Sequence, residues 1–304
     1  MDATEERVLA RADRLLAKHQ WKTAVPMLKD LEDNSTGEDD DILLPRLAEA
    51  LNGAGRFVES FDYIADNQSL FSDDLTSATT WLTAALGAGQ FIDARVFIHN
   101  CPSSWHDSLM ELVEEAEKKA HQTSAVSIKN QLKTFYHLGD KPVPDQSKLM
   151  AGGWKLPLAD FVTGAKFLLR DPFTNALIRS NLIETLHQLD FDEEVKYLWI
   201  DQQEYTVNPA RTNDLGDDNA LNQAKADLKE QLRDDPILTV HLGSQLDMEG
   251  MLLYPQVGRV ISDPHEWASA LVASQQGKPI HNEKIKKWQE KLNHEIQSLS
   301  EQIN

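Results

Sequence analysis

The chain has 304 residues, 41% of them hydrophobic and 26% charged, and its formal net charge at pH 7 is −19. A chain of this length and composition can bury a sizeable core and is long enough for two domains. The negative charge repels phosphate backbones and anionic membranes, so neither nucleic acid nor a membrane is an expected partner. Residues 278–291 are locally basic but include two glutamates, and we interpret them as the solvated face of a helix.

The cysteine content and the first residues of the chain indicate in which cellular compartment the protein is expected. Cys101 is the only cysteine, which excludes an intramolecular disulfide and a multi-cysteine zinc site. The first six residues lack the apolar run of a signal peptide, and no segment reaches about 18 consecutive apolar residues. We therefore expect a cytoplasmic protein.

Three segments in the first third of the chain share one pattern without gaps, spaced 36 and then 34 residues apart. They are residues 15–24 (LLAKHQWKTA), 51–60 (LNGAGRFVES) and 85–94 (ALGAGQFIDA). A period of this length is typical of stacked helical hairpins. In each segment an apolar helix ends, and an aromatic residue opens the next helix, followed three positions later by a small residue. The aromatic residues are Trp21, Phe57 and Phe91, and the small residues are Ala24, Ser60 and Ala94.

This pattern predicts how the helices of one hairpin pack. We expect the aromatic side chain to fill the gap between the two paired helices, and the small residue to let their backbones approach. Ala12 and Ala48 take the close-contact position of the first helix in two hairpins, whereas Leu82 stands there in the third. The third hairpin is therefore predicted to pack at a different angle or to end the array.

Residues 55–60 (GRFVES) and 89–94 (GQFIDA) resemble the turn and second-helix start of tetratricopeptide repeats. The resemblance covers about residues 5–105 and is weaker in the first segment, where His19 replaces the turn glycine. It implies an α-solenoid of about three helical hairpins whose concave groove binds a segment of another protein. A further amphipathic helix over residues 107–120 is expected to cap the last apolar face.

Glycine and proline mark a connector over residues 139–157, because three of each occur there. We therefore divide the chain into a tetratricopeptide-like helical-repeat domain, residues 1–138, and a C-terminal domain, residues 158–304. The C-terminal domain is predicted to be a smaller α+β domain containing a β-hairpin. The fold class as a whole is mainly α.

The hairpin strands are predicted at residues 195–200 and 204–209, which are rich in β-branched and aromatic residues. Two strands alone are marginally stable, and residues 256–261 are a candidate third strand. Residues 171–209, together with 252–255, are similar to the C-terminal region of tetratricopeptide-repeat proteins of unassigned function from low-GC Gram-positive bacteria. That resemblance implies no known active site.

Asp-Pro pairs predict three helix starts in this domain, because Asp is a favoured N-cap and Pro a favoured first helical residue. Two more helices are expected over about residues 219–233 and 282–300, the last with an apolar face. The pairs are Asp171-Pro172, Asp235-Pro236 and Asp263-Pro264, and the apolar face consists of Ile285, Trp288, Leu292, Ile296 and Leu299.

The sequence lacks the motifs of common enzyme and metal sites. Gly53-Ala54-Gly55 begins like a dinucleotide fingerprint, but it follows a helix rather than a strand and lacks the third glycine. His265-Glu266 lacks the second histidine of a zinc-protease helix, because Ser269 stands at that position. We therefore predict no enzyme, and no catalytic, cofactor-binding or metal-binding residues.

Helical spacing places six polar residues on the concave face of the repeats. Chaperone-binding members of the family hold a terminal carboxylate there with lysine and asparagine, and this clamp is missing. An acidic, hydroxyl-rich groove instead favours a basic or polar segment of a partner. The predicted groove residues are Asp13, Glu49, Asn52, Thr76, Thr79 and Thr83.

The favoured function is a non-catalytic adaptor or scaffold that binds a protein or peptide segment in this groove. One alternative is an intracellular peptide-binding sensor, and another is a homodimer built through the last helix around Trp288. A third is an enzyme in the C-terminal α+β domain, and its candidate residues are Asp201, Glu204, Tyr205 and His241.

Overall fold

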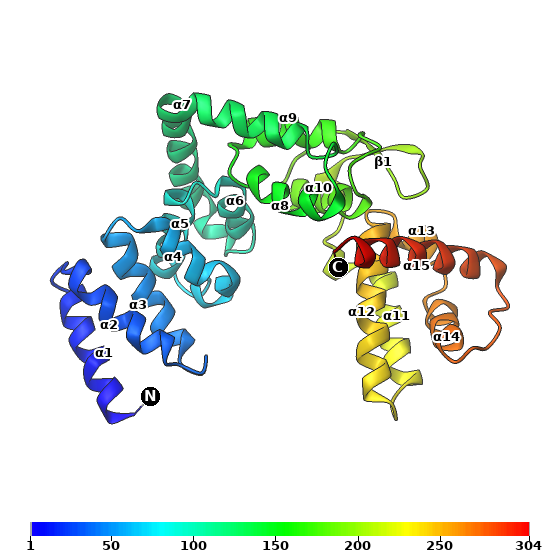
Figure 1. Cartoon of the computed structure of the whole chain (residues 1–304), viewed down its shortest axis with the longest axis horizontal. Helices are drawn as coiled ribbons and strands as arrows, with labels where there is room; N and C mark the ends of the chain where they lie inside the picture. The colour runs from blue at the N-terminus through cyan, green and yellow to red at the C-terminus, as the bar shows by residue number, and fades with distance from the viewer. Residues whose placement is uncertain (1, 304) are drawn as a thin grey trace. The chain divides into compact units, whose positions relative to one another are not determined.

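The computed structural model describes the backbone of residues 2–303 and the side chains of residues 2–297. This part of the chain is mainly helical and contains one two-stranded antiparallel sheet (Figure 1). No helix in it is both long enough and apolar enough to cross a membrane. The chain divides into two compact units, Met1–Gln131 with Trp154–Phe161, and Leu132–Gly153 with Val162–Asn304. The second unit contains more of the chain than the first, so the expectation of a smaller C-terminal domain is wrong.

The first unit begins with three consecutive helix pairs. Each of these helices packs against the next one along the chain, and the first helices also contact one another, α1 with α3 and α3 with α5. A 3₁₀ helix, Ala65–Phe71, separates the second pair from the third. The pairs are α1 (Ala3–Leu16) with α2 (Trp21–Asp33), α3 (Asp40–Gly53) with α4 (Phe57–Ile64), and α5 (Leu75–Gly87) with α6 (Phe91–His99).

All three pairs close through the same turn. His19, Gly55 and Gly89 adopt the left-handed conformation, with φ of 54°, 74° and 77°. In each turn the backbone N–H of the following residue donates to the carbonyl five positions earlier, at 2.9 Å. This closure is the Schellman motif, which requires a residue at positive φ. The first segment therefore makes the same turn with histidine, a residue that takes this conformation less readily than glycine.

The close-contact positions are buried as the sequence predicts. Ala24, Ser60 and Ala94 have no exposed surface, nor does Ala48. The Ser60 hydroxyl donates to the Ala48 carbonyl at 3.4 Å and so joins α4 to α3. Leu82 is buried as well, within an aromatic cluster around Trp81.

The core of the third pair continues into α7 (His106–Tyr136). The Trp81 ring stacks on Phe97 at 4.2 Å between ring centroids, and its indole N–H donates to the Ile64 carbonyl at 3.2 Å. Leu109 and Val113 of α7 are buried in the same cluster. The helix predicted at residues 107–120 is therefore confirmed, and it extends further, with non-helical φ and ψ at Ser124.

The predicted connector, residues 139–157, is largely structured. It contains α8 (Val143–Gly153), and the residues that follow belong to the first unit. The backbone N–H of Ile92 donates to the Trp154 carbonyl at 3.0 Å. Glycine and proline therefore mark helix ends here rather than an unstructured linker.

The second unit is also mainly helical. The end of α7 and most of α9 (Leu158–Leu168) belong to it, and two short 3₁₀ helices, Pro209–Arg211 and Leu215–Asp217, follow the sheet. Its other helices are α8, α10 (Ala176–Gln188), α11 (Asn219–Gln231), α12 (Pro236–Leu253), α13 (Val257–Val260), α14 (Pro264–Gln275) and α15 (Glu283–Ile303).

Two of the three predicted Asp-Pro helix starts are confirmed. Asp235 and Asp263 are the N-caps of α12 and α14, and each carboxylate accepts a backbone N–H three residues on. Asp171 is not a helix start, because α10 begins five residues later with Asn175 as its N-cap. The Asp171 carbonyl instead accepts from the buried guanidinium of Arg179 at 3.1 Å. The Asp171 carboxylate also accepts from the Phe173 backbone N–H at 3.1 Å and from the Thr174 hydroxyl at 2.9 Å, so these bonds together hold the segment in a turn.

The predicted β-hairpin is confirmed, with β1 (Val195–Leu198) antiparallel to β2 (Glu204–Val207). Residues 256–261, a candidate strand, instead form α13, and that prediction is wrong. Val257 and Val260 are both buried at helical spacing, which favours the helix. The hairpin is covered from this side, since the indole N–H of Trp199 donates to the Leu253 carbonyl at 3.2 Å.

The last helix, α15, buries part of its predicted apolar face. Ile285 and Leu292 are buried, and the Trp288 ring lies 5.6 Å from that of Trp199. Leu299 lies outside the residues whose side chains are described. Trp288 is thus engaged within its own chain.

Candidate partner-binding groove

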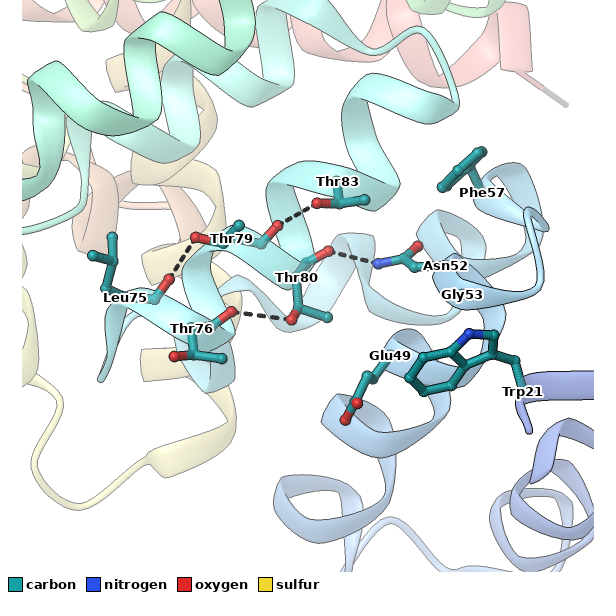
Figure 2. A pocket seen from close by; sticks show the side chains of 10 residues that line it. All are labelled: Trp21, Glu49, Asn52, Gly53, Phe57, Leu75, Thr76, Thr79, Thr80 and Thr83. Carbon is teal, nitrogen blue, oxygen red and sulfur yellow. Dashed lines mark hydrogen bonds between the residues drawn. The ribbon is translucent and has the colours of Figure 1, made fainter. Parts of the chain in front are cut away.

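The first unit carries a pocket between α3 and α5, with a volume of about 630 Å³ (Figure 2). We call it the α3–α5 groove. Aromatic side chains from α2 and α4 complete its lining. The lining residues are Trp21, Glu49, Asn52, Gly53, Phe57, Leu75, Thr76, Thr79, Thr80 and Thr83.

Five of the six predicted groove residues line this pocket, two from α3 and three threonines from α5. Asp13, the sixth, is not among the lining residues. Its carboxylate accepts from the Nε of Arg46 at 2.8 Å and so joins α1 to α3. Asp13 thus belongs to a contact between two first helices.

Helical periodicity explains why the threonines gather. Positions 76, 79, 80 and 83 lie on one face of α5, because residues three and four apart are neighbours on a helix. Trp81 and Leu82 lie on the buried side of the same helix. The core contact of α5 therefore turns its threonine face into the groove.

The threonine hydroxyls are engaged with their own helix. Thr79 donates to the Leu75 carbonyl at 2.7 Å, Thr80 to the Thr76 carbonyl at 3.0 Å, and Thr83 to the Thr79 carbonyl at 2.7 Å. These bonds use the hydroxyl hydrogens and leave the oxygen lone pairs. The three hydroxyls thus present acceptors and methyl groups to the groove.

The Asn52 side chain links α3 to α5 and has one acceptor atom without a hydrogen-bond partner. Its Nδ2 donates to the Thr80 carbonyl at 2.8 Å, which fixes the orientation of the amide because only the NH₂ group can face a carbonyl. Its Oδ1 is buried, and no donor reaches it within the described part of the chain. Buried polar atoms are normally hydrogen-bonded, so this oxygen is an unsatisfied acceptor in the wall of the groove.

Glu49 is the only charged residue of the lining. Its side chain is exposed, and no ion-pair partner for it is found among residues 2–297. Arg46, one turn earlier on α3, is engaged by Asp13 and by the Ile42 carbonyl. The charge of the lining is therefore negative.

Trp21 and Phe57 each contact the neighbouring hairpin, a contact that the expectation for the aromatic residues did not include. A Cβ added to Gly53 of α3 would lie 2.4 Å from the Trp21 ring. A Cβ added to Gly87 of α5 would lie 2.2 Å from the Phe57 ring. Each aromatic side chain thus covers a glycine in the next hairpin. The spacing of the two glycines, which equals the repeat period, was the signal for this contact.

We expect Gly53→Ala and Gly87→Ala each to destabilise the first unit by about 1–3 kcal/mol, since the added methyl overlaps an aromatic ring. Alanine normally stabilises a helix by about 1 kcal/mol relative to glycine. Urea unfolding followed by circular dichroism measures the change. Gly243→Ala in α12 is the control, because no atom lies within 4 Å of its added Cβ. Equal effects at all three positions would contradict the packing described.

The candidate catalytic residues of the second unit make local contacts. The Tyr205 hydroxyl donates to the Asp201 carboxylate at 2.8 Å, across the end of the hairpin. Glu204 accepts from Arg170 at 3.0 Å, and His241 is exposed on α12. The Tyr205–Asp201 bond lies within the hairpin, and the Arg170–Glu204 ion pair ties the hairpin to the segment after α9.

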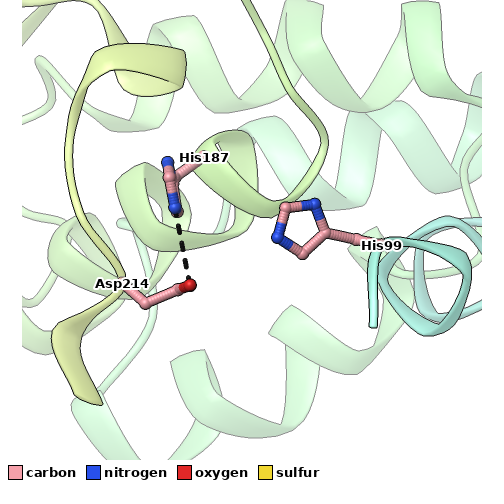
Figure 3. A group of neighbouring side chains, drawn as sticks. All are labelled: His99, His187 and Asp214. Atoms are coloured by element: carbon pink, nitrogen blue, oxygen red, sulfur yellow. Dashed lines mark ion pairs between the residues drawn. The ribbon is translucent and has the colours of Figure 1, made fainter. Parts of the chain in front are cut away.

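Another polar contact of the second unit ties α10 to the segment after the sheet (Figure 3). His187 Nε2 lies 3.5 Å from an Asp214 carboxylate oxygen, and its Nδ1 lies 3.0 Å from the Pro209 carbonyl. Because a carbonyl only accepts, Nδ1 carries a hydrogen. The contact with Asp214 becomes an ion pair when the ring is protonated.

The fold and the groove define the class: a mainly α-helical protein of two units, the first with an acidic groove between consecutive helix pairs. No protein-family model, no curated protein and no solved structure matches the chain.

Proposed function

We propose that this protein is a non-catalytic adaptor that binds a segment of another protein in the α3–α5 groove. The observation that carries the proposal is the composition of this groove. It combines half-buried aromatic side chains, Trp21 and Phe57, with polar groups from two first helices. Binding sites of this kind hold side chains by apolar contact and orient them with a few polar groups.

The first unit is proposed to be a tetratricopeptide-like array of three hairpins. Two observations support this: the three equal turns at His19, Gly55 and Gly89, and the contacts of α1 with α3 and of α3 with α5. In the repeat family the first helices line the concave face. The α3–α5 groove lies between two such helices.

A protein partner fits the charge of the chain, since a net charge of −19 opposes nucleic acid and anionic lipid. We place the protein in the bacterial cytoplasm, in keeping with the repeat resemblance and its single buried cysteine.

Site-specific photo-crosslinking tests the proposal. A photoreactive residue at Thr83, which lines the groove, is expected to capture one partner in the native cytoplasm. The same residue at Val58, exposed on α4 outside the lining, should not capture it. The adduct should disappear when Glu49→Lys is added, provided that circular dichroism shows the variant to be folded. A partner captured equally from both positions, or unaffected by Glu49→Lys, would contradict groove binding.

A further inference from the structure

We infer that the α3–α5 groove recognises an arginine side chain of the bound segment. This inference rests on the proposed function and deepens it, because it names the kind of side chain that the groove binds.

Acceptors predominate among the polar side-chain groups of the groove. Three threonine hydroxyls and the Asn52 amide already donate to backbone carbonyls of α5. What remains is the Glu49 carboxylate, the threonine lone pairs and the unpartnered Asn52 Oδ1, with the Trp21 indole N–H and the Thr76 hydroxyl as the donor groups. A ligand that supplies several N–H donors is complementary to this set.

The negative charge of the groove favours a cationic ligand group over a neutral hydrogen-bond donor. Glu49 brings a negative charge to the groove, and the nearest cation on the same helix, Arg46, is already paired with Asp13. A carboxylate or phosphate ligand would meet repulsion from Glu49 and would find few free hydrogen-bond donors in the groove. A basic side chain gains a charge-assisted hydrogen bond instead.

The aromatic lining favours guanidinium over ammonium. Trp21 and Phe57 line the groove beside the α3 residues, and both side chains are half-buried (Figure 2). A guanidinium group is planar, stacks on aromatic rings and offers five N–H donors in a fixed fork, whereas an ammonium is a strongly hydrated point charge. The combination of ring faces, a carboxylate and spread acceptors is therefore best matched by arginine.

Fluorescein-labelled peptide pools test this inference with the full-length protein. Each pool contains peptides of about twelve residues, randomised among uncharged residues around one fixed central residue. The fixed residue is arginine, lysine, citrulline, leucine or glutamate. Citrulline keeps the shape of arginine without its charge. We expect saturable binding of the arginine pool, measured by fluorescence anisotropy, about tenfold tighter than that of the citrulline pool.

Variants assign the effect to the groove. Glu49→Gln is expected to weaken binding of the arginine pool about tenfold, so that this pool no longer binds more tightly than the citrulline pool. Glu6→Gln makes the same chemical change at an exposed position of α1 outside the lining and should leave binding unchanged. Thermal unfolding by circular dichroism verifies that both variants fold.

The outcomes separate this inference from the proposed function. If the arginine, citrulline and leucine pools bind equally well and this binding is lost in Thr83→Arg, the arginine assignment is overturned. The groove would then still be a peptide-binding site. Tighter binding of the lysine pool would overturn the preference for guanidinium. Arginine selectivity that survives Glu49→Gln would place recognition elsewhere and overturn the inference. No saturable binding of any pool up to about 1 mM would overturn both the inference and the proposed function.

Discussion

Glu117→Ala is expected to lower the free energy of unfolding of the first unit by about 3–5 kcal/mol, because it leaves a buried guanidinium without its partner. The side chains of Arg95 and Glu117 are only 10% and 13% exposed. They form two parallel hydrogen bonds, Nε to Oε1 at 2.9 Å and Nη2 to Oε2 at 3.0 Å. The backbone N–H of Leu158 also donates to Glu117 at 3.1 Å. The substitution therefore also removes an acceptor that holds the start of α9.

A double-mutant cycle distinguishes loss of the pair from loss of packing. The cycle uses Arg95→Met and Glu117→Leu, singly and together. The double variant removes both charges and keeps apolar volume, so it should recover most of the stability lost in Glu117→Leu alone. Urea unfolding measures the four free energies. Hydrogen exchange at Leu158 reports on the backbone bond, and we expect faster exchange in both Glu117 variants. Additive single and double effects would contradict a buried ion pair.

Glu249→Gln is expected to remove a large part of the pH dependence of the second unit. The Glu249 side chain is 0% exposed and is held by α14 and α12. The Trp267 indole donates to Oε2 at 2.9 Å, and the Gln245 amide donates to Oε1 at 3.0 Å. Burial nevertheless raises the pKa of the carboxyl from an ordinary value of 4.5 to about 7, because two neutral donors do not replace full hydration.

Proton linkage determines whether this carboxyl makes the second unit more or less stable as the pH rises. Since the pKa is higher in the folded state, the folded chain binds the proton more tightly than the unfolded chain between pH 4.5 and about 7. The stabilisation from the protonated carboxyl is complete below pH 4.5 and is lost as the pH rises through about 7. A shift of this size corresponds to roughly 3 kcal/mol.

Urea unfolding between pH 5 and pH 8, in steps of about half a unit, checks this prediction. The wild type should lose stability across this range, and Glu249→Gln should be more stable than the wild type at pH 8, because its amide stays neutral. Glu230→Gln, an exposed position on α11, is the control and should follow the wild type. A Glu249→Gln variant with the wild-type slope would show that this carboxyl does not titrate with folding.

Local patterns in the sequence predicted the elements that depend on neighbouring residues. The turns at Gly55 and Gly89 are encoded by residues that tolerate positive φ, and Asp235 and Asp263 cap their helices with atoms three residues away. Helical spacing also placed five polar side chains in one groove, because the period of a helix determines which residues share a face.

Elements that depend on distant residues were decided by the tertiary structure alone. The hydrophobic residues at 257 and 260 fit a strand or a helix, and packing beside the hairpin selects the helix. Trp154 follows a predicted connector, and its hydrogen bond to Ile92 places it in the first unit.

The α3–α5 groove combines both kinds of information. The sequence by itself determined which helix faces carry its threonines and Glu49, because those positions follow from periodicity. Only the tertiary structure decided that Trp21 and Phe57 cover glycines of the next hairpin and that Asp13 is paired with Arg46. The reason is physical: periodicity assigns a side chain to a face, whereas its partner is determined by the distance between helices that the rest of the core sets.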